Sequence, residues 1–444
     1  MTTDPPNFDL AIIGGGLSGS LLTIRLLERP PAERALRIIN CDRDGAFGSG
    51  VPYGERHAEP GFLLIEPVTQ STPPEFQHWL ARHGARLARM ALGSDDAALR
   101  AWATENFQAI AAEQFELLYV PRRWFGQFMR ERHAAAVARA SADGAADITF
   151  EHAECVDVVP RNDGFAVTFA DGRVVRASLV VLAIGNIPRP TLAVPGPGDG
   201  YLHDIWRQGY AGLRGILESR FATLRRALDV TLIGSGATAG EVVYYLAHQR
   251  ELAGRIRSIE VVSRSGYLAG GGAQLGTPAR EIRADAAARP AAREYVEASR
   301  RLALAGVLTS RAHEIRSAPR LLASGRLALE ENSRPGAHVG EADVIVNCSG
   351  SGDIDVTSSR LLRNMLGEDR QFQANHLKAG FALRDAFETA HVPGCFILGP
   401  LLNHEAVETH VESILGVYRA VERLAPSLHS RIMKLLSIDA AGAG

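Results

Sequence analysis

The chain has 444 residues, of which 46% are hydrophobic and 22% charged, as in a globular protein with two or three lobes. The formal net charge of -2 gives no electrostatic reason to expect a nucleic-acid partner, and no block of Lys or Arg suggests binding to a membrane. Four widely spaced cysteines, with no CxxC pair, argue against a disulfide framework, a zinc site and a thiol redox motif.

Residues 1–7 lack the charged region and apolar run of a secretory signal, and no apolar stretch of the sequence is long enough to cross a bilayer. We therefore expect a cytoplasmic enzyme with a small-molecule substrate and no metal. The sequence does not predict an oligomeric state.

The stretch of residues 8–27 predicts a dinucleotide site. A short apolar strand runs into Gly14-Gly15-Gly16-Leu17-Ser18-Gly19 and then into a helical pattern. Gly14 allows a tight turn, Gly16 lets the backbone approach a pyrophosphate, and Gly19 lets the helix pack closely against the strand. The free N–H groups at the start of the helix then face the phosphates.

The acid that such a site needs follows the next predicted strand, residues 36–41. Asp42 is placed to accept hydrogen bonds from a ribose. The Gly-rich loop after it, residues 43–54, is either a surface turn or a wrap around the cofactor, and the sequence leaves both open. GxGxxG by itself is a weak signal, but the strand, the helix and the acid together favour a nucleotide site.

Residues 75–140 have a mostly helical pattern, and about 148–176 indicate a small antiparallel β insert. Arg122 and Arg123, which interrupt the helical region, form either a solvated face or a phosphate or carboxylate contact. A buried strand then ends at Gly185, and four prolines between residues 188 and 197 indicate a domain boundary.

The pattern of strand, glycine turn and helix seen in residues 8–27 recurs from Asp229, offset by 220 residues (Gly14 to Gly234). A strand leads into Gly234-Ser235-Gly236-Ala237-Thr238-Ala239-Gly240, with Ala239 at the position of the third glycine, a permitted variant. The copies stay in register to their second strands, where residues 38–42 match residues 259–263. Where the first copy has Asp42, the second has Ser263-Arg264.

This difference predicts two different cofactors. A carboxylate binds the ribose 2′-OH and repels a 2′-phosphate, whereas an arginine accommodates the phosphate. We therefore expect FAD at the first site and NADPH, rather than NADH, at the second. A plain surface role for Arg264, or a gene duplication with one inactive site, would produce the same pattern.

The remaining patterns complete an α/β fold with two Rossmann-like domains, each with a parallel central sheet. A buried strand within residues 343–350 is expected to return the chain to the first domain, and the turn at 393–400 to lead into a helix at about 407–424. The predicted FAD-binding domain comprises residues 1–195 and 345–444, and the predicted NAD(P)-binding domain comprises residues 196–344.

With these motifs the chain resembles the bacterial FAD/NAD(P)-binding flavoprotein oxidoreductases related to the class B flavin-containing monooxygenases. The resemblance covers most of the chain. It rests on the two glycine turns, Phe47 to Gly54, Pro121 to Gly126, Ala183 to Asn186, Ser263 to Gly266, Leu398-Gly399-Pro400 and Glu408-Thr409. It implies reduction of FAD by hydride from NADPH and, in the monooxygenase branch, oxygenation of a small molecule through a C4a-(hydro)peroxyflavin.

The motifs and the resemblance together name the candidate site residues. For FAD they are Gly14, Gly16, Ser18, Gly19, Asp42, Arg43, Ser49, Tyr53, Arg122, Val156, Gly185, Gly399 and Thr409. For NADPH they are Gly234, Ser235, Gly236, Ala237, Thr238, Ser263 and Arg264. The candidate catalytic residues are Glu66, His404 and His410, because His can move a proton near neutral pH and a buried Glu can have a raised pKa.

The sequence departs from the family where flavin and substrate would meet. Leu63-Leu64-Ile65-Glu66-Pro67 stands where the family has Leu-Leu-Asn-Val-Pro, and Val407-Glu408-Thr409-His410 where it has Trp-Glu-Thr-Thr. Three functions therefore stay open. We favour an NADPH-reduced monooxygenase over a flavin dehydrogenase or oxidase that takes electrons from its organic substrate, and over a non-catalytic nucleotide-binding or scaffold protein.

Overall fold

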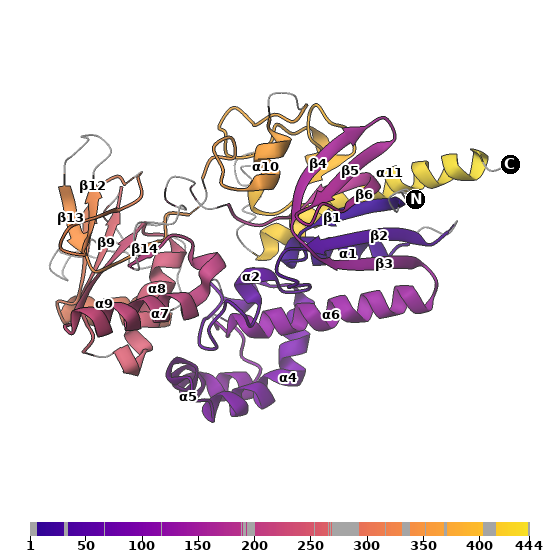
Figure 1. Cartoon of the computed structure of the whole chain (residues 1–444). Coiled ribbons are helices and arrows are strands. Elements are labelled where there is room, and N and C mark those ends of the chain that lie inside the picture. The colour runs from indigo at the N-terminus through magenta and orange to yellow at the C-terminus, as the bar shows by residue number, and fades with distance from the viewer. Residues whose placement is uncertain are drawn as a thin grey trace. The chain divides into compact units, whose positions relative to one another are not determined.

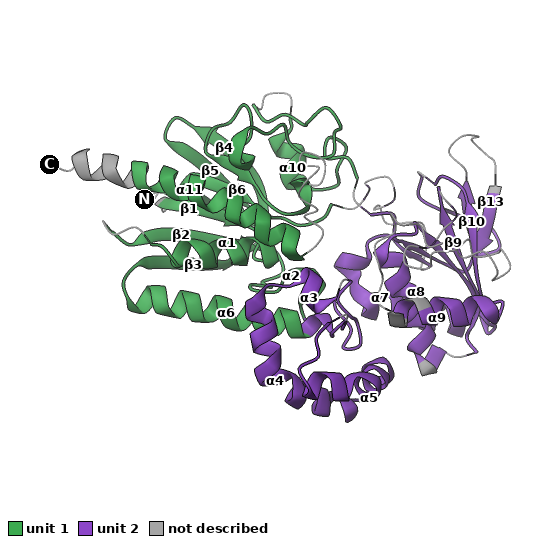
Figure 2. Ribbon diagram, turned by 180° about the vertical axis from the view of Figure 1, so that it is seen from behind, with its two compact units in different colours: residues 1–54, 124–187, 352–444 green, residues 55–123, 188–351 purple. Residues whose placement is uncertain are grey.

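The computed structural model describes residues 7–30, 34–65, 67–116, 118–187, 200–252, 254–264, 293–315, 317–330, 338–350, 352–367, 371–402 and 414–442, with the single residues 189, 192, 266 and 268. Contacts divide the chain into two compact units, which Figure 2 shows in different colours. The first unit comprises residues 1–54, 124–187 and 352–444, and the second comprises residues 55–123 and 188–351.

A seven-stranded sheet forms the centre of the first unit (Figure 1), in the order β3-β2-β1-β6-β5-β4, with β15 also paired to β6. β2 pairs in parallel with β1 and β3, and β6 pairs in parallel with β1 and β15. On the other side of β6, β5 pairs antiparallel with β6 and with β4. The strands are β1 (Asn7–Ile13), β2 (Leu36–Asp42), β3 (Ala146–His152), β4 (Cys155–Arg161), β5 (Gly164–Phe169), β6 (Val174–Leu182) and β15 (Cys395–Ile397). β1 is a continuous apolar run because it lies in the middle of the sheet, and its residues Leu10, Ala11 and Ile12 have no exposed surface.

Helices and short turns complete the first unit. They are α1 (Leu17–Leu27), α2 (Gly50–Tyr53), α6 (Arg122–Ala142), α10 (Arg360–Met365), η2 (Asp385–Phe387), η3 (Pro400–Leu402) and α11 (Ile414–Gly442). The first two residues of α6 group with the second unit. α11 packs against α1 and continues past Pro426 to Gly442, beyond the end at about residue 424 that the sequence predicts.

The second unit contains a five-stranded parallel sheet in the order β10-β9-β8-β14-β7 and a three-stranded antiparallel sheet, β11-β12-β13. The strands are β7 (Tyr201–Leu202), β8 (Leu228–Ile233), β9 (Ile256–Ser263), β10 (Leu308–Ala312), β11 (Arg320–Leu321), β12 (Leu327–Glu330), β13 (His338–Ala342) and β14 (Val344–Asn347). The helices are α3 (Val68–Ser71), α4 (Pro74–Leu92), α5 (Ala97–Ala111), α7 (Ile205–Leu224), α8 (Ala237–His248), η1 (Arg250–Leu252) and α9 (Arg293–Leu304). The predicted fold class, with two Rossmann-like parallel sheets and antiparallel and helical insertions, is confirmed.

Three segments lie elsewhere than their sequence pattern suggests. β14 pairs with β8 and β7, so the strand expected to return the chain to the first domain belongs to the second unit. Residues 55–123, which the sequence places in the FAD-binding domain, group with the second unit. β3, which the sequence pattern assigns to the antiparallel insert, is a parallel strand beside β2. An apolar pattern identifies a strand, but the partner of that strand depends on contacts far along the chain.

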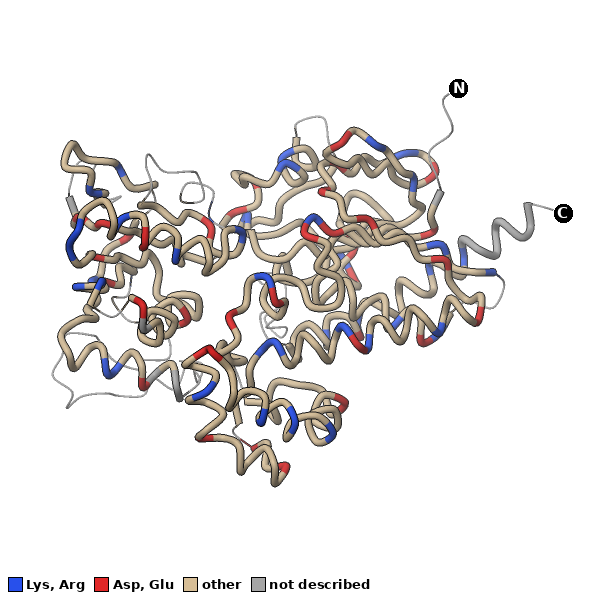
Figure 3. The backbone as a smooth tube through the Cα atoms, turned by 60° about the horizontal axis from the view of Figure 1, so that its bottom comes forward, with Lys and Arg blue, Asp and Glu red and all other residues tan. Residues whose placement is uncertain are grey.

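Positively and negatively charged residues are mixed along the backbone (Figure 3). Many form exposed pairs, such as Arg173 with Glu151 and Arg25 with Glu28, which stabilise the fold little because water screens them. Among the described helices, none combines the length and the apolar content that crossing a membrane requires.

Candidate nucleotide-binding sites

The first glycine turn follows β1 at the carboxyl edge of the parallel strands. Gly14 has a φ of 111°, and its N–H donates to the carbonyl of Cys41 at 2.7 Å. A side chain on Gly14 would overlap with the carbonyl of Ala183, and a side chain on Gly19 would overlap with the carbonyl of Gly14. Both positions therefore require glycine for steric reasons.

Helix α1 begins directly after Gly16, which is its N-cap residue. The first N–H groups of the helix, those of Leu17 and Ser18, have no acceptor within the helix, so they are donors for an anion. Gly399 lies against the same turn, because a β-carbon built on it would be 3.0 Å from Ser18 Oγ. The structure therefore brings together two predicted FAD contacts, Ser18 and Gly399, from opposite ends of the chain.

Asp42 holds the glycine turn and the following loop together. One carboxylate oxygen accepts the N–H of Gly15 at 2.8 Å, and the other accepts the N–H groups of Asp44 at 2.9 Å and Ala46 at 3.0 Å. These bonds use three of the roughly four lone-pair sites of a carboxylate, which leaves about one for a ribose hydroxyl. The predicted ribose contact stays a prediction that this geometry permits.

The loop of residues 43–54 packs on the glycine turn, so it is not a plain surface turn. The Phe47 ring lies where a side chain on Gly15 would be, and the N–H of Gly48 donates to the Gly15 carbonyl at 3.0 Å. Gly50 faces Gly16, since a β-carbon on Gly50 would be 2.8 Å from the Gly16 Cα. A role of this loop in wrapping the cofactor stays a prediction.

The other predicted FAD contacts in the loop are buried or have protein partners. Ser49 is buried, and Arg43 pairs with Asp44 at 2.9 Å. The ring of Tyr53 meets the ring of Phe125 edge to face, with centroids 5.2 Å apart. These contacts shape the loop, and none of them tests binding of FAD.

The second glycine turn repeats the geometry of the first. Gly234 has a φ of 100°, and its N–H donates to the carbonyl of Val262 at 2.8 Å. Val262 is the residue that the predicted register equates with Cys41. The N–H of Cys348 donates to the Ile233 carbonyl at 2.8 Å, as the N–H of Ala183 donates to the Ile13 carbonyl at 2.7 Å. The internal repeat predicted from the sequence is therefore a repeat of hydrogen bonds in space.

The second turn has an open approach. A β-carbon on Gly236, the N-cap residue of α8, would meet no other atom within 4 Å, and the neighbouring Ala237 is exposed. Ser263 at the end of β9 is buried, and its hydroxyl accepts the N–H of Gly266 at 3.0 Å. Arg264 follows it and is exposed. Because β8 and β9 are parallel neighbours, the turn and Arg264 lie at the same edge of the sheet.

The remaining predicted residues are in several places. The backbone carbonyl of Val156 accepts the side-chain amide of Asn364 at 2.8 Å, and Gly185 has a φ of 77° with open space where a side chain would be. Arg122 lies in the second unit, where Glu241 binds its guanidinium, and its predicted FAD contact stays a prediction. Glu66, His404, Thr409 and His410 lie outside the described residues.

Two residues at these turns are not among those that the sequence predicts. Phe47 covers Gly15, and Glu241 is a buried carboxylate on the helix that follows the second turn. A signal for Glu241 was present, since it is the one charged residue in the otherwise apolar or small-residue run 237–247. No comparable signal identifies the contact of Phe47.

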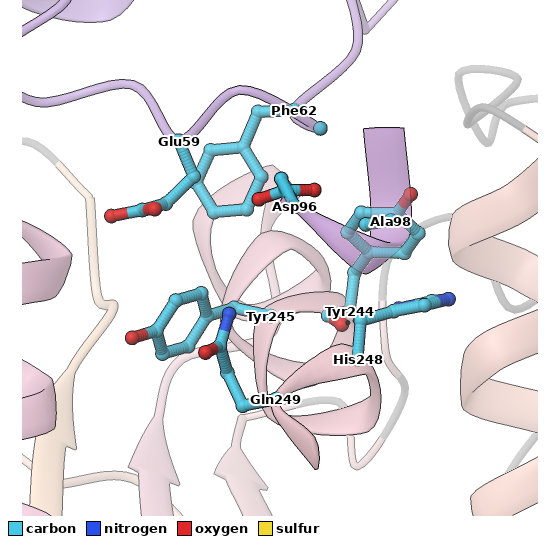
Figure 4. Close-up of a pocket in the computed structure, with 9 residues that line it drawn as sticks. Glu59, Phe62, Asp96, Ala98, Tyr244, Tyr245, His248 and Gln249 are labelled. Atoms are coloured by element: carbon cyan, nitrogen blue, oxygen red, sulfur yellow. Dashed lines mark hydrogen bonds between the residues drawn. The ribbon is translucent and has the colours of Figure 1, made fainter. Parts of the chain in front are cut away.

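A small recess in the second unit lies beside α8 (Figure 4). Glu59, Phe62, Asp96, Tyr244, Tyr245 and His248 are among the residues that line it. Burial raises the pKa of Glu59, against the opposing charges of Arg214 and Arg123, and the charge of Asp96 adds to the rise. The recess has a volume of about 10 Å³, which is the space of one water molecule, so it is no cofactor site.

The chemistry of thiols and metals finds no support in the described part of the chain. Cys41, Cys155, Cys348 and Cys395 are all buried and unpaired, and burial raises the pKa of each thiol. In the same part of the chain, no group of His, Cys, Asp and Glu side chains has the arrangement of a metal site.

Residues 11–187, which include the first glycine turn, β2 and β6, match the family of FAD-NAD(P)-binding domains. This part of the chain is thus similar to FAD-NAD(P)-binding domains. Together with the two Rossmann-like units, this match supports FAD and NAD(P)H as cofactors.

An uncharacterized protein of Mycobacterium tuberculosis is 31% identical over 287 residues, which cover 60% of this chain and 52% of the relative. An uncharacterized protein of Mycobacterium bovis matches with the same figures. The chain therefore spans about half the length of the curated relatives it matches.

Solved structures share the fold over nearly the whole chain. Ornithine hydroxylase from Pseudomonas aeruginosa is 16% identical, with 96% of this chain and 99% of that chain covered and a TM-score of 0.58. A flavin-containing monooxygenase from Stenotrophomonas maltophilia is 15% identical with the same coverage and a TM-score of 0.53. T. acidophilum thioredoxin reductase is 13% identical, with 96% and 98% covered and a TM-score of 0.50. The fold is thus that of two-domain FAD/NAD(P)-binding oxidoreductases.

Proposed function

We propose that the chain is an FAD-dependent monooxygenase that is reduced by NADPH and oxidises a small molecule. FAD binds at the turn of residues 14–19, and NADPH binds at the turn of residues 234–240. The observation that carries the proposal is the repeat of one strand–turn–helix geometry, with an acid after the first copy and an arginine after the second.

FAD fits the first turn because of the groups that surround it. The first N–H groups of α1 suit the pyrophosphate, and Asp42 retains an acceptor site for the ribose. Gly16 leaves room for a backbone approach, since a β-carbon there would contact Gly50 Cα at 3.5 Å and no other atom closely. The family match also falls on this copy.

NADPH fits the second turn because that turn is open and carries a cation at its edge. Gly236 and Ala237 expose the start of α8, and Arg264 offers a planar guanidinium to a 2′-phosphate. NADH has no 2′-phosphate, so it gains nothing from this side chain.

The turn of residues 14–19 and Asp42 would hold FAD, which would supply acceptance of a hydride from NADPH and transfer of the electrons to dioxygen, with one oxygen atom entering the substrate and the other leaving as water. The residues of the chain bind and orient the cofactors and keep water out of the reaction. Glu66, His404 and His410 are the proposed proton donors and acceptors. The small-molecule substrate is part of the same proposal, and the predicted cytoplasmic location stays a prediction.

The deciding experiment is an anaerobic titration of the purified, FAD-loaded protein with NADPH and with NADH. We expect NADPH to remove the visible absorbance of the flavin at much lower concentration than NADH does. Reduction only by organic compounds would favour the dehydrogenase or oxidase, and a protein that retains no flavin would refute the proposal. After reduction, air should reoxidise the flavin with oxygenation of substrate rather than release of hydrogen peroxide alone.

Gly16→Val tests the placement of FAD separately from the reaction. The structure leaves space for a β-carbon at this position, so the variant should fold and lose FAD because its side chain occupies the approach to the pyrophosphate. A normal FAD content would contradict the placement.

A further inference from the structure

Arg122 and Glu241 form a buried ion pair in the second unit, although 119 residues separate them in sequence. Arg122 donates from Nη1 to Oε1 at 2.7 Å and from Nη2 to Oε2 at 3.0 Å. Arg122 is 4% exposed and Glu241 is 2% exposed. Two parallel hydrogen bonds between full charges are the strongest form of this contact.

The surroundings of the pair keep it charged and dry. The Tyr210 hydroxyl donates to Glu241 Oε2 at 3.4 Å, and the ring of Phe62 lies 4.8 Å from the guanidinium carbon of Arg122. Burial alone lowers the pKa of Arg122, but the charge and hydrogen bonds of Glu241, together with Tyr295 and Tyr210, outweigh it and raise that pKa, so the arginine stays protonated. Burial and the charge of Glu241 raise the pKa of Tyr210, which stays a neutral donor.

The pair lies close to the second glycine turn. Glu241 is five residues after Gly236 on α8, a distance of roughly 7 Å along a helix axis. Side chains on a helix tilt toward its N-terminus, so the carboxylate lies toward the first turn of α8. Two negative unit charges about 10 Å apart, at an effective dielectric constant of about 20, repel each other by an energy equal to roughly fifteenfold in a binding constant. An uncompensated carboxylate near two phosphates would therefore weaken their binding by at least about that factor.

We propose that Arg122 is a positioning residue that neutralises Glu241 and thereby preserves the affinity of the second glycine turn for the phosphates of NADPH. The inference rests on the proposed function, which places NADPH at this turn. It also assigns a role to the segment 55–123, because that segment supplies the cation that α8 itself lacks at this position.

The stability of the fold does not by itself require an ion pair here. Buried pairs can often be replaced by apolar side chains without loss of stability, whereas removal of one partner leaves an uncompensated buried charge. This asymmetry separates an electrostatic role from a purely structural one. If the role is electrostatic, variants that lack only Arg122, lack only the charge of Glu241, or lack both charges should differ in their affinity for NADP⁺.

The test is the dissociation constant of NADP⁺, measured by calorimetry on the FAD-loaded full chain of four variants. Arg122→Met leaves the carboxylate alone and should weaken NADP⁺ binding by about fifteenfold or more. Arg122→Met/Glu241→Met removes both charges and should restore the affinity to within about threefold of the wild type. Glu241→Gln keeps the shape and removes the negative charge, so it should bind NADP⁺ at least as tightly as the wild type. The control is Arg226→Met, which breaks the pair with the fully buried Asp343 and should leave NADP⁺ affinity unchanged.

The groups that face Glu241 are Arg122, Tyr210 of α7, Tyr295 of α9 and Cys348 after β14, and Arg122 is the cation among them. Its removal leaves the carboxylate without that cation. Recovery of NADP⁺ affinity in the double variant is therefore the readout that a purely structural role of Arg122 would not produce.

The outcomes separate this inference from the proposed function. If the wild type binds NADP⁺ but Glu241→Gln loses binding, or the double variant is as weak as Arg122→Met, the inference is overturned and the proposed function stands. If Arg122→Met does not fold, Glu241→Gln still decides. If the wild type binds no NADP⁺ while retaining FAD, the assignment of the second turn fails and the inference fails with it.

Discussion

Gly50 and Gly16 face each other so closely that a β-carbon on Gly50 would lie 2.8 Å from the Cα of Gly16. Gly50 belongs to the loop after Asp42, and Gly16 is the N-cap residue of α1. This approach makes the loop one wall of the first glycine turn, and it exists only because neither residue has a side chain.

Gly50→Ala should therefore displace the glycine turn and remove most of the bound FAD. The φ of 63° at Gly50 adds a backbone cost of about 1–2 kcal/mol for any residue with a side chain. The matched control is Gly144→Ala, which has a φ of 65° but no atom within 4 Å of the new β-carbon. Absorbance of the purified proteins measures FAD content, and equal losses in both variants would show that the approach to Gly16 is unimportant.

Arg264→Ala should raise the KM for NADPH by about tenfold or more, because a charge-assisted contact with the 2′-phosphate is lost. The KM for NADH should not change, since NADH lacks this phosphate. Arg257→Ala serves as control, because Arg257 is on β9, the strand that Arg264 follows, but pairs with Asp229. Steady-state flavin reduction measures both constants, and an unchanged KM for NADPH would remove the assignment.

His133 should make the first unit sensitive to acid. Burial lowers its pKa from the ordinary 6.5 to about 4, and its Nε2 has no hydrogen-bond partner within the described protein. Between pH 6.5 and 4 the unfolded chain binds the proton more readily than the folded chain, so the stability contributed by neutral His133 is complete above this window. It is lost as pH falls, by up to about 3 kcal/mol.

Urea unfolding at pH 7 and pH 4.5 tests this expectation. His133→Leu should lose less stability than the wild type over this interval, whereas His78→Leu, at an exposed position of α4, should behave like the wild type. The same loss in His133→Leu and wild type would show that other groups cause the acid sensitivity.

The four thiols should be unreactive in the native protein. Burial raises the pKa of Cys155 to about 12 and raises that of Cys41, Cys348 and Cys395 as well, so the reactive thiolate is scarce near neutral pH. A thiol-reactive dye should label none of them before unfolding and all four in urea. Rapid labelling of a native thiol that responds to NADPH would instead reopen thiol–disulfide chemistry, which the thioredoxin reductase fold by itself does not establish.

Local patterns were enough to predict both glycine turns. The steric need for Gly14 and the register that equates Cys41 with Val262 follow from short stretches of sequence, and the structure contains the corresponding hydrogen bonds. The helices of region 75–140 were also predictable, because their apolar spacing is a local signal.

The tertiary structure decided everything that depends on partners far apart in the chain. The sheet that β14 joins, the approach of Gly50 to Gly16 and the contact of Gly399 with Ser18 have no local signature. Arg122 shows the difference most clearly, since the sequence offered an arginine suited to a phosphate or carboxylate and the fold supplied the carboxylate of Glu241. Backbone geometry is set within a few residues, whereas the partner of a buried charge is set by which segments the folded chain packs together.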